Sequence, residues 1–187
     1  GVGYTIQEAA ISELNVTGDT LFKPLVLLAG DVFFNIPLNP EKGTSLTWYG
    51  AYQYSDYGKN FLLNGAVMNP ANGVGGLASL NGSGNGFPIR GTGNTFYSQF
   101  GFAFGNKIIS KQGKLQPFVA CQYSDFQALD EAMIMTEGGL NWFITGDHST
   151  KLSINYQNRP IFVRDQNFKA VVSHYRGMAQ IQLQASF

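Results

Sequence analysis

Apolar and polar residues alternate with a period of two through most of this chain, in long segments separated by turns rich in Gly, Asn, Asp and Pro. This pattern predicts β-strands rather than helices. A tilted strand needs about nine to eleven residues to cross a bilayer, whereas strands of globular proteins most often have about five or six. The lengths therefore favour an all-β fold, a transmembrane antiparallel β-barrel. The expected strands are residues 23–36, 44–57, 93–105, 114–127, 131–145, 150–162 and a C-terminal strand.

The polar positions of two expected strands are candidate lumen residues. In 150–162, Leu152, Ile154 and Tyr156 alternate with polar residues, and 131–145 shows the same alternation. In a water-filled barrel the apolar face meets lipid and the polar face lines the lumen. The predicted pore-lining residues are Glu137, Asn141, Lys151, Asn155, Gln157 and Arg159. The parity of the connecting hairpin, with a turn over 147–149, also places Glu137 roughly opposite Arg159.

The C-terminal segment alternates without interruption. Its glutamines and Ser186 fall on one side of the strand, and its apolar residues fall on the other. We expect it to be the closing strand of a barrel, with the apolar side towards lipid. The apolar positions are Ala179, Ile181, Leu183, Ala185 and Phe187.

The other segments are harder to assign. Residues 1–22 alternate weakly and are expected to be a loop or a partial strand, with a short helix over 7–14 as one option. Residues 23–187 would form the C-terminal part of a barrel, with a long loop at 58–92 and another long connection at 163–175. Bacterial single-chain barrels have an even number of strands. Either a further strand is hidden in 1–22 or 58–68, or this chain is part of a larger barrel.

Composition excludes several function classes. Lys and Arg balance Asp and Glu at 12 each, so no basic face for nucleic acid is expected. A lone Cys121 leaves no disulfide framework and too few thiolates for a structural zinc site. The Gly-rich stretch 68–94 lacks the phosphate-loop pattern, and His148 and His174 are placed in a turn and a loop. We therefore expect neither an enzyme nor a cofactor or metal site.

Aromatic and basic residues leave two questions open. Aromatics gather near the ends of expected strands, which favours membrane-interface girdles over the core of a β-sandwich. Basic side chains either line an anion path or are scattered solvated charges. These basic residues are Lys151, Arg159, Arg164 and Arg176.

Three stretches carry a family resemblance: GTGNTFYSQFGFAF (91–104), LQPFVACQYSDFQALD (115–130) and GGLNWFITGDHSTKLSINYQNRPIF (138–162). They resemble the C-terminal part of outer-membrane porins related to the phosphate-selective porins O and P, in the form found in Bacteroidetes-like bacteria. The resemblance covers about residues 44–187.

The resemblance implies a barrel of sixteen or eighteen strands, usually trimeric, that passes small polar solutes or anions across the outer membrane of a Gram-negative bacterium. This chain is about half the length that such a barrel needs. The family's anion-binding residues have no match here, so phosphate selectivity is not implied. The final alternation ending in Phe187 is similar to the signal read by the barrel-assembly machinery. The implied partners are that machinery, outer-membrane lipid, and either further copies of the chain or a further barrel segment.

The preferred hypothesis is therefore a passive diffusion porin, or the C-terminal portion of one. Two alternatives stay open. One is a non-conducting scaffold barrel in an outer-membrane assembly, and the other is a soluble all-β binding protein.

Overall fold

The computed structural model describes residues 1–14, 17–65, 80–81, 86–105, 113–146 and 149–186, and it contains no helix in these ranges. None of the described residues belongs to a helix that could cross a membrane. The strands are β1 (Val2–Leu14), β2 (Thr20–Asn39), β3 (Thr44–Asp56), β4 (Leu62–Asn64), β5 (Pro88–Gly91), β6 (Gly93–Ala103), β7 (Lys114–Phe126), β8 (Met133–Phe143), β9 (Thr150–Arg164) and β10 (Ala170–Ala185).

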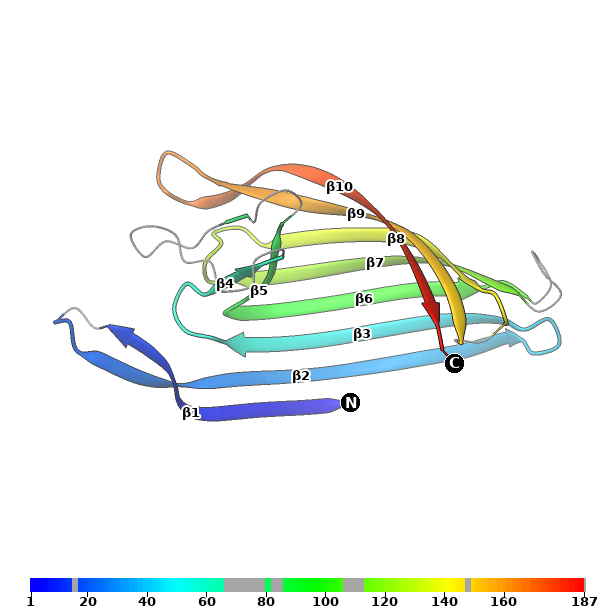
Figure 1. Cartoon of the computed structure of the whole chain (residues 1–187), viewed down its shortest axis with the longest axis horizontal. Coiled ribbons are helices and arrows are strands. Elements are labelled where there is room, and N and C mark those ends of the chain that lie inside the picture. The colour runs from blue at the N-terminus through cyan, green and yellow to red at the C-terminus, as the bar shows by residue number, and fades with distance from the viewer. Residues whose placement is uncertain (15–16, 66–79, 82–85, 106–112, 147–148, 187) are drawn as a thin grey trace.

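Eight of these strands form one antiparallel sheet in the order β1-β2-β3-β6-β7-β8-β9-β10, and β4 pairs with β5 in a small second sheet (Figure 1). The prediction of an all-β antiparallel fold is confirmed, and each of the expected strands is present. Within the described residues the large sheet is open, with β1 and β10 as its edges. We call the end that holds residues 40–43 and 144–146 the turn end, and the end that holds 57–61 and 165–169 the loop end.

Strand β1 corrects the expectations for the first residues. The option of a helix over 7–14 is wrong, because these residues belong to a strand that pairs with β2. The pairing register shifts between Gln7 and Ile11, and Ala9 has a positive φ of 53°. A β-bulge of this kind interrupts the regular alternation of side chains. The weak period-two signal of this segment therefore reflects the bulge.

The connection between β9 and β10 is also shorter than predicted. The two strands extend to Arg164 and from Ala170, so residues 165–169 join them instead of 163–175. Asp165 holds this turn through its Oδ1, which accepts hydrogen bonds from the backbone N–H groups of Asn167 and Lys169. His174 consequently lies within β10, opposite Ile161, and not in a loop.

The sheet has two chemically different faces, since directly paired residues point to the same side. One row across the apolar face consists of Phe34, Trp48, Phe100, Val119, Gly138, Tyr156 and Ala179. One row across the polar face consists of Gln116, Asn141, Ser153 and Gln182. The alternation seen in single strands thus continues across the whole sheet.

Aromatic side chains on the apolar face stack from strand to strand. Trp48 stacks on Phe34 with ring centroids 5.6 Å apart, and Phe96 lies 4.8 Å from Tyr52. These rings are nevertheless well exposed; Phe96, for example, keeps 48% of its accessible surface. The aromatic residues form rows across the strands and cover no core on this side of the sheet.

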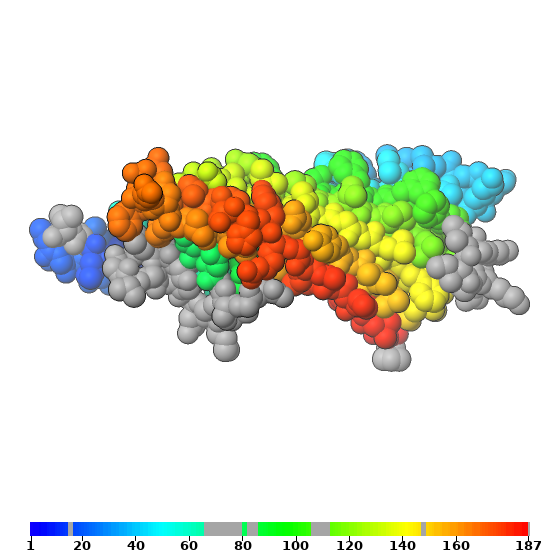
Figure 2. All heavy atoms as spheres, turned by 90° about the horizontal axis from the view of Figure 1, so that it is seen from above, coloured from blue at the N-terminus to red at the C-terminus, as the bar shows by residue number. Residues whose placement is uncertain are grey.

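The polar face is the concave one. Phe33 and Asn35 on β2 line the same hollow as Lys151 on β9. In a flat sheet five strand spacings, roughly 24 Å, would separate these strands. Figures 1 and 2 show the turn-end parts of β9 and β10 bending away from the central strands.

A compact hydrophobic cluster lies at the loop end. Every member is at most 9% exposed, and its two phenylalanines, Phe162 and Phe126, are 1% and 2% exposed. Pairing between β8 and β9 stops at Thr136 and Asn158, so the cluster fills the space where these strands separate. Its members are Leu62, Leu80, Phe126, Ala128, Leu129, Met133, Phe162 and Ala170.

Candidate functional site

The concave polar face holds all six residues predicted to line a pore. Glu137, Asn141, Lys151 and Asn155 line one hollow of about 590 Å³, which we call the polar hollow. Gln157 and Arg159 continue along β9 towards the loop end. Ser153 of β9 also lines this hollow, together with residues of β6, β7 and β10: Gln99, Phe118, Gln180, Ile181 and Gln182.

Glu137 is the centre of a hydrogen-bond network across β8, β9 and β10. It accepts hydrogen bonds from the side-chain amides of Asn155 and Gln157, the latter at 2.9 Å. Asn155 Nδ2 also donates to Gln180 Oε1 on β10, at 3.2 Å. The only acidic side chain lining the polar hollow is therefore fixed by neutral amides.

The predicted opposition of Glu137 and Arg159 is wrong by two residues. Glu137 lies directly opposite Gln157. The prediction that the apolar residues of both strands share one side is confirmed, since Leu140 lies opposite Ile154. Arg159 donates from Nε and Nη2 to Gln157 Oε1, with the Nε distance at 3.0 Å. Gln157 thus connects the carboxylate and the guanidinium through its own amide.

A second network crosses the middle of the sheet towards the turn end. Gln116 Nε2 donates to Thr47 Oγ1 at 3.1 Å, and its Oε1 accepts from Asn141 Nδ2 at 3.3 Å. Ser153 Oγ donates to Asn141 Oδ1 at 2.7 Å. Gly101 lies between Thr47 and Gln116 on β6, where a Cβ atom would come within 2.7 Å of Thr47 Oγ1. The absence of a side chain at this glycine lets the two polar groups meet.

Part of the segment between β3 and β6 folds back over the loop end of the polar face. Asn81 donates from Nδ2 to the Phe162 carbonyl at 2.6 Å and accepts from the Phe162 N–H at 3.1 Å. Phe87 lies over the guanidinium of Arg159, 3.8 Å from its Cζ atom. These contacts leave Arg159 only 6% exposed. The predicted long loop at 58–92 thus contacts the face expected to line the lumen; its residues 66–79 and 82–85 lie outside the described part of the chain.

Sequence reasoning did not select Lys114. This lysine and Lys151 line a second hollow of about 340 Å³ at the turn end of the polar face. The alternation of 114–127 places Lys114 on the same side of the strand as Gln116. Its even position in the sequence could therefore have identified it as a residue of the polar face. Arg164 donates to the Phe168 carbonyl at 2.9 Å in the β9–β10 turn, and Arg176 lies opposite Arg159 in β10.

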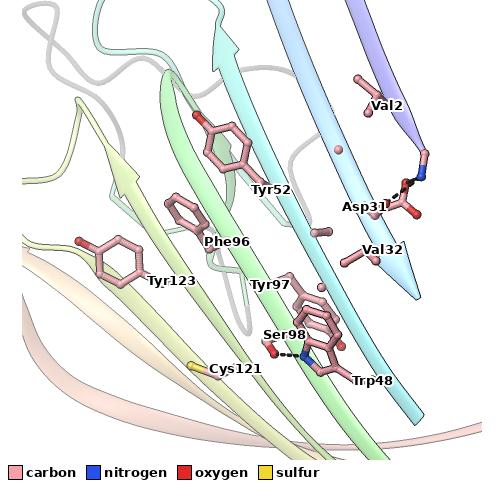
Figure 3. Close-up of a pocket in the computed structure, with 14 residues that line it drawn as sticks. Val2, Asp31, Val32, Trp48, Tyr52, Phe96, Tyr97, Ser98, Cys121 and Tyr123 are labelled. Atoms are coloured by element: carbon pink, nitrogen blue, oxygen red, sulfur yellow. Dashed lines mark hydrogen bonds and ion pairs between the residues drawn. The ribbon is translucent and has the colours of Figure 1, made fainter. Parts of the chain in front are cut away.

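The apolar face carries a shallow hollow of about 650 Å³ near β1 (Figure 3). Trp48 lies along it, and its indole Nε1 donates to Ser98 Oγ at 3.0 Å. Small residues such as Gly50 and Cys121 form part of the lining, and Tyr52, Phe96 and Tyr123 lie beside them (Figure 3). The lining is almost wholly apolar, which suits contact with hydrocarbon rather than chemistry.

The four described residues of the predicted assembly signal, Ala179, Ile181, Leu183 and Ala185, share one face of β10. Ile181 and Leu183 pair with Ile154 and Leu152, so they extend the apolar face to the edge of the sheet. They remain 74% and 67% exposed. Phe187 lies outside the described residues.

No group of three or more metal-ligating side chains gathers anywhere in the described ranges. Cys121 is an exposed free thiol on β7, and the predicted position of His148 lies outside the described residues. The arrangement of the polar face can orient water and small polar solutes through amides and hydroxyls. Comparison with protein families, with curated proteins and with solved structures finds no match for this chain.

Proposed function

We propose that this chain forms the wall of a porin-like channel through which small polar solutes diffuse passively across an outer membrane. The observation that supports the proposal is the pair of opposed, continuous faces on one curled sheet. The concave face carries mainly polar side chains from β3 to β10, and the other face is mainly apolar over the same strands. This is the arrangement that lipid outside and water inside require of a barrel wall.

The exposed apolar face argues against a soluble binding protein. Soluble monomers rarely expose a contiguous apolar patch of more than a few hundred Å². Here large apolar side chains remain exposed on every strand of the main sheet, for example Tyr4, Phe34, Tyr52, Phe100, Val119, Leu140, Ile154 and Ile181. Contact with lipid acyl chains would remove these apolar side chains from water without a protein partner.

The chemistry of the polar face indicates weak selectivity. Most of its hydrogen-bonding groups are neutral amides and hydroxyls that bind one another, such as Gln116, Asn141 and Ser153. Glu137 is held by amides, and Lys114 and Lys151 lie nearer the turn end. Such a surface replaces the hydration of many small hydrophilic solutes equally well.

Neighbouring positions on β10 provide a matched test. Gln182 lines the polar hollow, whereas Leu183 lies on the apolar face. In planar lipid bilayers we expect discrete conductance steps from the unmodified protein. Gln182→Trp should reduce the step size because the indole enters the water path, and Leu183→Trp should leave it unchanged. Equal effects of the two substitutions, or no conductance at all, would contradict the proposal.

The fold-back segment favours a second candidate, a scaffold barrel with a blocked lumen. Asn81, Phe87 and Arg159 cover the loop end of the polar face. Solute flux through the purified protein separates the candidates, since a scaffold would pass none. Deleting residues 70–90 should raise conductance if this segment narrows an open channel, and unchanged conductance would remove it from the constriction.

Placement in an outer membrane also determines the partners that we propose for the chain. Outer-membrane lipid would contact the apolar face, and the assembly machinery would recognise the apolar residues of β10 up to Phe187. Trimer formation stays a prediction from the family resemblance. The proposal includes no catalytic step and no cofactor.

A further inference from the structure

Aromatic rings on the polar face carry the inference, which rests on the proposed function. Phe118 on β7 lines the polar hollow, and Phe33 on β2 lines the hollow at the turn end. Phe33 keeps 61% of its accessible surface. Contact between an apolar ring and water is unfavourable, so a solute that covers such a ring gains binding free energy.

The two hollows adjoin each other. Gln99, Asn141 and Lys151 line both of them. The polar hollow has a volume of about 590 Å³, within the range of about 300–1,000 Å³ that is usual for small-molecule sites. A molecule lying along both hollows would meet the ring of Phe118, the ring of Phe33 and the shared polar groups.

Glycines make room for the Phe118 ring. In the row across the sheet, Phe118 has Gly101 on one side and Gly139 on the other. A Cβ atom at Gly139 would come within 2.7 Å of Phe118 Cε1 and Cζ, so the tip of the ring lies over this glycine. The ring is therefore close to the strand backbone, in the same hollow as the amides of Asn141 and Asn155.

Tyrosines extend the aromatic surface between the two phenylalanines. Tyr49 lies directly opposite Phe33, and its ring centroid is 6.0 Å from that of Tyr97. The Tyr97 hydroxyl donates to Gln99 Oε1 at 2.8 Å. Four neighbouring strands, β2, β3, β6 and β7, thus each place one of these rings on the polar face.

Sugars combine the two kinds of group that this surface can bind. The C–H groups on the face of a pyranose ring pack against the negative face of an aromatic ring. Neighbouring sugar hydroxyls bind the paired polar atoms of amides and carboxylates. Among the described residues that line the polar hollow, Glu137 and Lys151 are the charged ones, and their charges balance. The amides alone favour no particular solute, whereas the rings beside them favour a neutral sugar.

We propose that the two hollows form a binding track for a neutral linear oligosaccharide, with one sugar unit against Phe118 and another against Phe33. Three strand spacings separate β2 from β7, roughly 14 Å in a flat sheet. A molecule that touches both rings therefore has several sugar units.

Reversible block of the ion current tests the track. The unmodified protein in planar lipid bilayers would be exposed to maltopentaose, cellopentaose, glucose and a polyethylene glycol of the same mass as the pentaoses. We expect at least one pentaose to block the current in a saturable way. It should do so at a lower concentration than glucose or the polymer, because only a chain of sugar units reaches both rings.

Phe33 and Phe34 provide a matched pair of variants, since they are neighbours on opposite faces and are 61% and 51% exposed. Phe33→Ala should raise the half-blocking concentration roughly tenfold, and Phe118→Ala should act in the same direction. Phe33→Tyr, which keeps the ring, should restore most of the binding, and Phe34→Ala should leave it unchanged. Calorimetric titration of the pentaoses into protein in detergent should give the same order of affinities.

Three results would overturn the proposal. The first is that neither pentaose binds, the second is that glucose or the polymer blocks as well as the pentaose, and the third is that Phe33→Ala and Phe34→Ala have equal effects. The channel is judged separately from the track. Ion conductance without calorimetric binding of a pentaose would reject the track alone, and binding without conductance would reject the channel alone.

Discussion

Gln116 and Thr47 form a hydrogen bond across strand β6, 3.1 Å from Nε2 to Oγ1, although a whole strand lies between them. The bond exists because Gly101 leaves the space above its backbone empty. We expect Gly101→Ala to break it, since the new Cβ would lie within 2.7 Å of Thr47 Oγ1. Leaving such groups without partners costs about 1–3 kcal/mol. The free energy of unfolding, measured by urea titration in detergent, should fall by that amount.

Gly138 provides the control for this substitution. It also lies mid-strand, but a Cβ there would have only the Phe118 carbonyl oxygen nearby, at 3.9 Å. Gly138→Ala should be neutral or slightly stabilising. Equal losses in the two variants would mean that the space at Gly101 has no special role.

Val119 distinguishes a membrane protein from a soluble one. It lies on the apolar face in the middle of β7 and is 61% exposed. A lysine facing lipid near the bilayer midplane costs about 2–4 kcal/mol, whereas an exposed surface substitution in water usually changes stability by less than about 0.5 kcal/mol. We expect Val119→Lys to show the larger loss in refolding measurements in lipid vesicles. Gln182→Lys, on the polar face, should show little, and a small loss at both positions would argue against lipid contact.

Ser98 stabilises the orientation of Trp48. Its Oγ accepts the indole Nε1–H at 3.0 Å on a face that otherwise offers apolar groups. Ser98→Ala should lower the free energy of unfolding by about 1 kcal/mol. The measurement is a double-mutant cycle with Trp48→Phe, in which the loss at Ser98 should largely disappear. If Ser98→Ala lowers the stability equally in the Trp48→Phe background, the loss does not come from this hydrogen bond.

Glu13, near the end of β1, makes a pH-dependent contribution to the stability of the folded protein. Hydrogen bonds from Lys23 Nζ, at 2.5 Å, and from the Lys59 N–H, at 2.9 Å, lower the pKa of Glu13 below its ordinary value of 4.5. A carboxyl whose pKa is lower in the folded state stabilises that state above the unfolded pKa. The contribution is lost as the pH falls through the folded pKa. Lys23→Met should bring the pKa, followed by NMR titration of the carboxyl, back towards 4.5; no change would show that Lys23 is not the main cause.

The sequence predicted the main strands well because period-two alternation survives wherever a strand has one apolar and one polar face. It failed at β1, where the bulge around Ala9 breaks the period. It also made the β9–β10 connection too long, because the pairing register shifts between Val172 and His174, and this irregularity breaks the period of two without ending the strand.

The site was predictable only in part, and for a related reason. Parity assigns Glu137, Asn141 and Lys151 to one face from the sequence alone. It does not determine the register of the hairpin, so Glu137 faces Gln157 and not Arg159. Contacts between strands distant in the sequence, such as that of Phe87 with Arg159, have no periodic signal.

Strand β2 is 20 residues long, and its first six residues, 20–25, have no partner in β3. At about 3.3 Å per residue it measures roughly 66 Å, while a hydrocarbon layer of about 30 Å crossed at 45° takes roughly 42 Å of strand. In the proposed membrane setting, the β1–β2 hairpin therefore extends beyond the bilayer on the loop side. Near its tip, Glu13 binds both Lys23 of β2 and the Lys59 amide of the connection 57–61. The hairpin is the part of the molecule that a large particle approaching from the loop side would touch first.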